Sequence, residues 1–98
     1  MDYQLSVRKE AETDIAEAFD YYESCRKSLG HDFLLAVEAS LNKIQRNPVL
    51  YKEIHRQIRR VFINRFPYGI YFVIMGNTVI VIGVIHARKN PRHWKKHQ

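Results

Sequence analysis

The chain has 98 residues, a net charge of +6 at pH 7, and 46% hydrophobic and 27% charged residues. This length fits one domain, 1–98, and the balance excludes global disorder. The single cysteine, Cys25, excludes an internal disulfide and a multi-cysteine zinc site, and it is typical of a reducing cytoplasm. No apolar run approaches the roughly 20 residues that span a bilayer, and the first residues lack the apolar core of a signal peptide. We therefore expect a cytoplasmic protein without a membrane partner.

Hydrophobic periodicity predicts one strand, two helices and then three more strands. The first strand is expected at 3–7, and apolar residues from Ala11 to Tyr22 then recur at helical spacing. Gly30 is expected to supply the left-handed residue that ends this helix. A second helix is predicted from about residue 31 to 46, and Asn47-Pro48 stops it because proline lacks the backbone N–H. The short connection predicts an antiparallel helical hairpin.

The last three strands are predicted at 58–63, 70–75 and 78–86, the final two being almost continuously apolar. Gly76-Asn77 is typical of a two-residue hairpin turn with glycine first, and Gly83 indicates a bulge or a close helix approach. The predicted fold is therefore α+β, with the helical hairpin packed on a small antiparallel sheet. Because the hairpin covers one face only, we expect the other face to be basic and exposed or covered by another chain.

The charges are distributed unevenly along the chain. All ten acidic residues lie within 2–53, whereas 56–98 contains nine Lys or Arg and no Asp or Glu. Such asymmetry in a small domain predicts a basic face that binds nucleic acid or an acidic protein segment. The simpler interpretation is a solvated surface that only keeps the protein in solution.

Arginine predominates among the candidate partner-binding residues, and its planar fork suits carboxylates and phosphates. Side chains alternate along a strand, so at most one of the adjacent Arg59 and Arg60 joins a basic sheet surface. Trp94 is an interface anchor or, on burial grounds, a residue that pins the C-terminal turn. The aromatic residues near the strands, including Phe62, Tyr68 and Tyr71, are expected mainly in the core. The partner-binding candidates are Arg59, Arg60, Arg65, Arg88, Lys89, Arg92 and Trp94.

Histidines near the C-terminus are the candidates for acid–base chemistry. His86 ends a buried strand, where a structural histidine is the commoner case, and no partner for it is evident in the sequence. Its spacing from His93, without acidic neighbours, is poor for zinc, so no metal site is expected. No motif for a phosphate-binding loop, a dinucleotide fold, a metalloprotease or a serine hydrolase is present, and no cofactor is expected.

Four segments together resemble the RelE/ParE superfamily of type II toxin–antitoxin toxins. The segment around Phe66-Pro67-Tyr68 and the run from His86 to Trp94 are similar to the ParE branch in particular. The four segments are Ala11-x-x-Asp14-Ile15 with Tyr21-Tyr22, Leu29-Gly30-x-x-Phe33, Arg60-x-x-x-x-Arg65-Phe66-Pro67-Tyr68-x-Ile70-Tyr71-Phe72, and Val81-x-x-Val84-x-His86-x-Arg88-Lys89-x-Pro91-x-x-Trp94.

The resemblance implies a β-α-α-β-β-β order and an antitoxin encoded beside the toxin. We also expect a homodimer or a toxin–antitoxin heterotetramer, because an exposed apolar sheet face would otherwise risk association. ParE toxins as a family poison DNA gyrase and block replication by binding, without an accepted catalytic set. RelE toxins instead cleave messenger RNA on the ribosome, and that alternative would use Arg60, Arg65, His86, Arg88 and His93. The C-terminal tyrosine of such ribonucleases is missing, because the last tyrosine is Tyr71. A third hypothesis is a non-toxic module that acts as a co-repressor with its antitoxin. The tail 95–98 is expected to be disordered.

Overall fold

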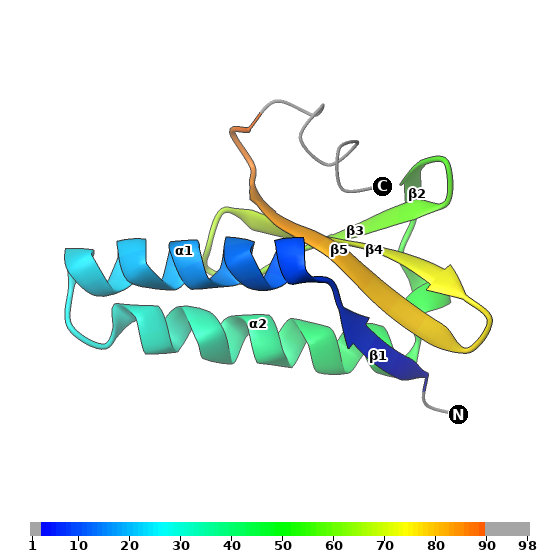
Figure 1. The fold of residues 1–98 in the computed structure, drawn as a ribbon, viewed down its shortest axis with the longest axis horizontal. Coiled ribbons are helices and arrows are strands. Elements are labelled where there is room, and N and C mark those ends of the chain that lie inside the picture. The colour runs from blue at the N-terminus through cyan, green and yellow to red at the C-terminus, as the bar shows by residue number, and fades with distance from the viewer. Residues whose placement is uncertain (1–2, 90–98) are drawn as a thin grey trace.

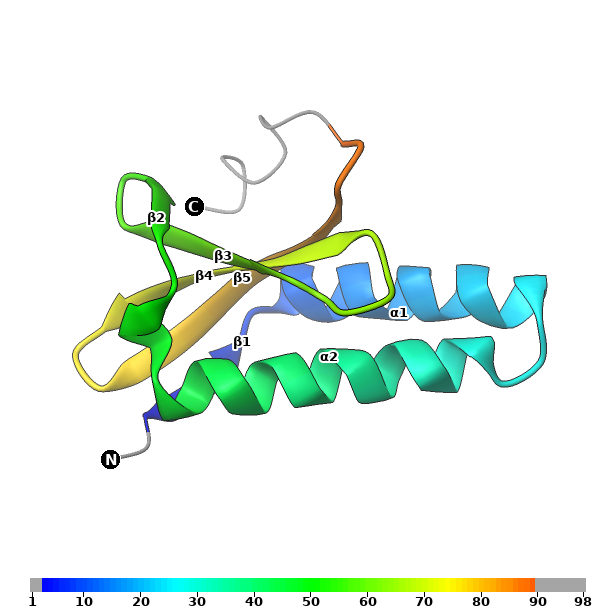
Figure 2. The same ribbon diagram turned by 180° about the vertical axis from the view of Figure 1, so that it is seen from behind.

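The structure, a computed structural model, describes residues 3–89, so the predicted disordered tail lies outside the described residues. A helical hairpin forms one layer and packs against one face of a five-stranded sheet (Figures 1 and 2). The elements in chain order are β1 (Gln4–Val7), α1 (Lys9–Cys25), α2 (Leu29–Arg46), the 3-10 turn η1 (Pro48–Leu50), β2 (Glu53–His55), β3 (Ile58–Phe62), β4 (Tyr68–Met75) and β5 (Thr78–His86).

The sheet has the strand order β1-β5-β4-β3-β2, and it is mixed rather than wholly antiparallel as predicted. The β2–β3, β3–β4 and β4–β5 pairs are antiparallel, whereas β1 runs parallel to β5, with Gln4 opposite Thr78 and Val7 opposite Val81. The sequence pattern identifies a strand but not its partner. Here β1 takes the open edge of β5 and leads almost directly into α1, which packs on the same strand.

The short strand β2 is absent from the sequence-based prediction. It has only three residues, too few to show alternation, and its register with β3 is irregular between Glu53 and His55. The turn that follows places both Arg56 and Gln57 at positive φ, 42° and 70°. Such a turn is usually predicted from Asn-Gly or Asp-Gly, so the sequence Arg56-Gln57 does not indicate it.

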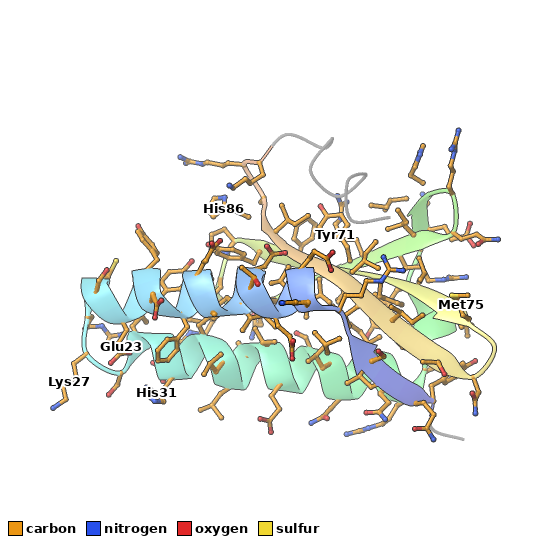
Figure 3. All side chains as sticks on the ribbon, viewed as in Figure 1. Glu23, Lys27, His31, Tyr71, Met75 and His86 are labelled. Carbon is orange, nitrogen blue, oxygen red and sulfur yellow. The ribbon has the colours of Figure 1, made fainter. Side chains whose placement is uncertain are left out.

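The junction between the helices corrects the role predicted for Gly30. The left-handed residue is Ser28, with φ 72°, and Gly30 is a buried residue in the first turn of α2. A Cβ atom at Gly30 would lie 2.8 Å from both Cδ2 and the backbone oxygen of Phe19, so glycine permits the close helix approach. Glu23 closes the turn, because its carboxylate accepts the backbone N–H groups of Ser28 and Gly30, each at 2.9 Å (Figure 3).

The β4–β5 hairpin forms as predicted. Gly76 has φ 61° in the two-residue turn, as a glycine-first turn requires. The predicted irregularity near Gly83 is a bulge: Tyr71 pairs with Gly83 but Phe72 pairs with Val81, which leaves Ile82 as the extra residue. The bulge reverses the alternation of β5, so the even-numbered residues beyond it turn toward the helices.

The hydrophobic residues form one cluster on each face of the sheet. The cluster between sheet and helices centres on Phe33 and Phe72, which are fully buried. The second cluster lies on the face away from the helices, where Figure 3 labels Tyr71. Its buried members are Ile58, Tyr71, Ile82 and Ile85.

Gly30→Ala is expected to destabilise the fold by about 1–2 kcal/mol, because the steric conflict with the Phe19 backbone outweighs the helix-propensity gain of roughly 0.5–1 kcal/mol. Chemical denaturation monitored by circular dichroism measures the change. Ser28→Gly at the same turn is the control, and it should be neutral or stabilising because it relieves a left-handed non-glycine residue. A more stable Gly30→Ala variant would contradict the close approach.

The carboxylate of Glu23 makes the helical turn sensitive to acid. The N–H bond from Ser28 is the main cause that lowers its pKa from 4.5, helped by the bond from Gly30. The ionised form therefore stabilises the fold above its unfolded pKa, and this stabilisation is lost as the pH falls through the lowered folded pKa. The stability gap between the native protein and Glu23→Gln should shrink as the pH falls below about 4.5. Urea denaturation across pH tests this, with Glu38→Gln as the matched control on α2.

Candidate functional site

Arg59 and Arg60 point to opposite faces of the sheet, as alternation on β3 predicts. Arg59 lies on the helix side, where its guanidinium donates to the backbone oxygens of Val49 and Tyr51. It also forms an ion pair with Glu53, with 3.4 Å between Nη2 and Oε1. These contacts tie β3 to η1 and the start of β2. Arg59 is therefore a structural residue whose donors are already engaged.

Arg60 lies on the face away from the helices, and its guanidinium rests on aromatic rings. Its central carbon is 4.6 Å from the centroid of Phe62, two residues along the same strand, and 6.0 Å from that of Tyr71, its cross-strand neighbour. Gly69, opposite Phe62, leaves room for the arginine stem, because a Cβ there would lie 3.3 Å from Arg60 Cγ and Cδ. We call Arg60, Phe62 and Tyr71 the Arg60–Phe62 surface.

Arg60 and Phe62 form the accessible part of the Arg60–Phe62 surface, whereas the ring of Tyr71 is buried. Phe62 is 53% exposed, which corrects its predicted place in the core. Arg60 is half-buried, yet it makes no hydrogen bond or ion pair with any residue between 3 and 89. The rings of Phe62 and Tyr71 therefore contact a cation whose donors are engaged by no residue of the described range 3–89 and suit a carboxylate or phosphate. Phe62 could have been found from its position two residues after Arg60 on a strand, which places both on one face.

Arg65 lies in the loop between β3 and β4, on the side of α2. It has φ 75°, and its guanidinium carbon is 5.7 Å from the ring centroid of Phe66, a residue of the helix-side core. Together with Asn64 it borders a depression of about 290 Å³ against α2, whose lining residues there include Asp32 and Lys43. Arg65 is thus separated by the sheet from the Arg60–Phe62 surface.

His86 ends β5 on the helix side, beside α1 (Figure 3). Its ring lies 5.1 Å from that of Tyr68 in an edge-on arrangement, and its Nδ1 accepts the backbone N–H of Arg88 at 3.0 Å. In this geometry Nδ1 carries no proton, so the proton of the neutral ring is on Nε2. Lys89 and His86 border the same cavity, and Arg88 is exposed between them.

The structure brings only some of the candidate residues together. His86, Arg88 and Lys89 are neighbours, but Arg59, Arg60 and Arg65 occupy three separate environments. The single contiguous basic zone expected from the charge distribution therefore does not form from these arginines. The remaining candidates, Arg92, His93 and Trp94, lie outside the described residues.

Within residues 3–89, no three His, Cys, Asp or Glu side chains gather as metal ligands. Over the same range, no helix combines the length and hydrophobicity needed to cross a bilayer.

Comparison with known proteins decides the family. The model of the ParE toxin of the type II toxin–antitoxin system parDE matches residues 5–91. The chain belongs to the ParE toxin family. It is therefore a toxin of a type II toxin–antitoxin system, and its expected partner is an antitoxin. No curated protein sequence matches this ParE-family chain.

Solved structures share the fold at low sequence identity. A chain of the chromosomal ParDE system from P. aeruginosa has a TM-score of 0.79 and 12% identity, covering 88% of this chain and 97% of that one. A chain of the RelBE2 toxin–antitoxin complex from Mycobacterium tuberculosis has a TM-score of 0.62 and 17% identity, and the match covers 88% of this chain and 92% of that one. A double mutant of the E. coli toxin RelE in the free state has a TM-score of 0.59 and 12% identity, and the match covers 99% of this chain and 94% of that one. These similarities confirm the predicted α+β fold class.

Substitution of the two adjacent arginines should change the stability of the fold to different extents. Arg59→Met removes hydrogen bonds to two backbone oxygens and an ion pair with Glu53, so it should lower the free energy of unfolding by about 1–3 kcal/mol. Arg60→Met retains the apolar stem and should change the free energy of unfolding by no more than about 0.5–1 kcal/mol. Guanidinium chloride denaturation measures both. Equal losses would contradict the assignment of Arg59 as the structural arginine.

Proposed function

We propose that this ParE-family toxin inhibits DNA gyrase by binding it through the Arg60–Phe62 surface, and that a cognate antitoxin neutralises it. Its action is stoichiometric inhibition and not cleavage of messenger RNA. Family membership supports the toxin role. The observation that carries the choice of mechanism is the separation of the residues that a ribonuclease would need.

Cleavage by the ribose 2′-hydroxyl requires a base, a charge stabiliser and a leaving-group acid around one phosphate. Here Arg60 lies on the helix-free face, Arg65 lies toward α2 and His86 lies beside α1. These three residues, which RelE-like chemistry would use together, do not face one common point. This arrangement favours inhibition by binding over the ribonuclease alternative.

The Arg60–Phe62 surface has the features of a binding hot spot. An exposed aromatic ring and an arginine are the side chains that most often dominate interface energetics. The rings of Phe62 and Tyr71 hold the guanidinium in place, which reduces the conformational entropy lost when a partner binds. Pairing with a carboxylate or a phosphate would supply specificity through the planar fork of Arg60.

The test uses purified toxin, freed from antitoxin, in a gyrase supercoiling assay. The native protein should inhibit supercoiling at micromolar concentration or below, and added antitoxin should restore it. Arg60→Ala with Phe62→Ala should raise the toxin concentration for half-inhibition at least tenfold, since loss of a hot spot costs about 2 kcal/mol or more. Arg46→Ala, an exposed arginine at the end of α2, is the matched control and should inhibit like the native toxin.

Two other results would redirect the assignment. Unimpaired supercoiling at micromolar toxin, together with new 5′ ends on translated messenger RNA that disappear with Arg88→Ala, would establish the RelE-like ribonuclease instead. Induced expression without growth arrest would favour the co-repressor hypothesis.

A further inference from the structure

A small cavity lies between α1 and the end of β5, on the side of the sheet opposite the Arg60–Phe62 surface. Its volume is about 280 Å³, at or below the range of roughly 300–1,000 Å³ typical of pockets for drug-sized ligands. It is therefore sized for one inserted side chain and not for a cofactor. The lining residues are Asp14, Glu17, Ala18, Tyr21, Tyr68, Val84, Ile85, His86 and Lys89.

Helical spacing explains why α1 supplies one wall. Residues 14, 17, 18 and 21 recur at intervals of three and four, which places them on one stripe of the helix. Asp14 Oδ2 accepts the backbone N–H of Val84 at 3.0 Å, which anchors α1 to β5 beside the bulge. Glu17, one turn later, is exposed and makes no ion pair within the described part of the chain. Among the described residues, the cavity is thus bordered by the carboxylates of Asp14 and Glu17 and by the basic side chains of His86 and Lys89, and Glu17 is the exposed carboxylate at its edge.

Aromatic rings form much of the remaining wall. Tyr21 is 60% exposed at the mouth, and Tyr68 is half-buried beside the ring of His86. The pKa of Tyr68 is raised, first by burial, then by repulsion from Tyr21 once that ring is ionised, and then by the carboxylates of Asp14 and Glu17. Burial and negative charge therefore act together on the inner ring. Rings next to carboxylates make a favourable site for a flat, weakly hydrated cation.

We propose that this cavity receives the guanidinium of an arginine side chain presented by a partner polypeptide. The carboxylate of Glu17 would accept its N–H groups while the rings of Tyr21 and Tyr68 pack against its face. Charge complementarity selects a cation, and the planar, aromatic-lined walls select guanidinium over the compact, strongly hydrated ammonium of lysine. This inference does not depend on the gyrase proposal, because the two sites lie on opposite sides of the sheet.

The direct test is a titration of the intact toxin with N-acetyl-arginine amide, followed by NMR. The backbone amide of Val84 and the rings of Tyr68 and His86 should shift in a saturable manner, with a dissociation constant in the millimolar range expected for one small fragment. Glu17→Gln should weaken binding about fivefold or more, and Tyr21→Leu should weaken it as well. Glu10→Gln, on the first turn of α1 and away from the cavity, should leave it unchanged.

Three results would overturn the proposal. The first is equal shifts with the uncharged citrulline analogue, which would remove the role of charge. The second is equal or tighter binding of N-acetyl-lysine amide, which would remove the preference for guanidinium. The third is unchanged affinity in a folded Glu17→Gln variant, because Glu17 is exposed and its amide form should preserve the fold. Supercoiling activity enters none of these measurements, so the gyrase proposal stands or falls separately.

Discussion

The antiparallel pairing of β4 with β5 is the interaction on which the sheet of this toxin is built. It contains eight residue pairs, and β1 and β3 extend the sheet from its two outer edges. The bulge at Ile82 reverses which residues of β5 face the helices. Before the bulge these are the odd-numbered Val79 and Val81, and after it they are the even-numbered Val84 and His86. Asp14 on α1 accepts a hydrogen bond from the backbone N–H of Val84 just past the bulge, so α1 is anchored to β5 at the point where the alternation reverses.

The bulge determines which side chains each face of the sheet presents near the end of β5. Without the bulge, His86 would lie on the same face of the sheet as Arg60. With it, His86 joins the acidic stripe of α1, and Arg60 remains on the opposite face with Phe62 and Tyr71. The sheet thus separates a cationic, aromatic surface from an acidic, aromatic cavity.

Much of the architecture could be predicted because it depends on local periodicity. Short stretches of sequence were enough to predict both helices, the end of α2 before Pro48, the turn at Gly76 and the irregularity near Gly83. The parallel partner of β1 and the three-residue β2 could not be predicted, because pairing is settled by tertiary contacts and a short strand shows no alternation.

The candidate site was harder to predict, because charge along a chain does not specify direction in space. The alternation of side chains along β3 correctly predicted that Arg59 and Arg60 lie on opposite faces of the sheet. The choice of Arg60 as the available one required knowing that backbone oxygens near η1 engage Arg59. Gly30 shows the same limit at the helix junction: the sequence suggested a left-handed residue, but the backbone of Phe19 made glycine necessary there.

The parallel pairing of β1 with β5 also governs when this protein can mature during synthesis. Gln4 finds its strand partner only at Thr78, so the first strand has no place in the sheet until nearly the last one has been translated. The helical hairpin is made early, and the ring of Phe33 lacks its neighbours Phe66 and Tyr68 until the chain reaches β4. The sheet can therefore be completed only after β5 has been made, and a fragment truncated before β5 would lack the strand that pairs with both β1 and β4.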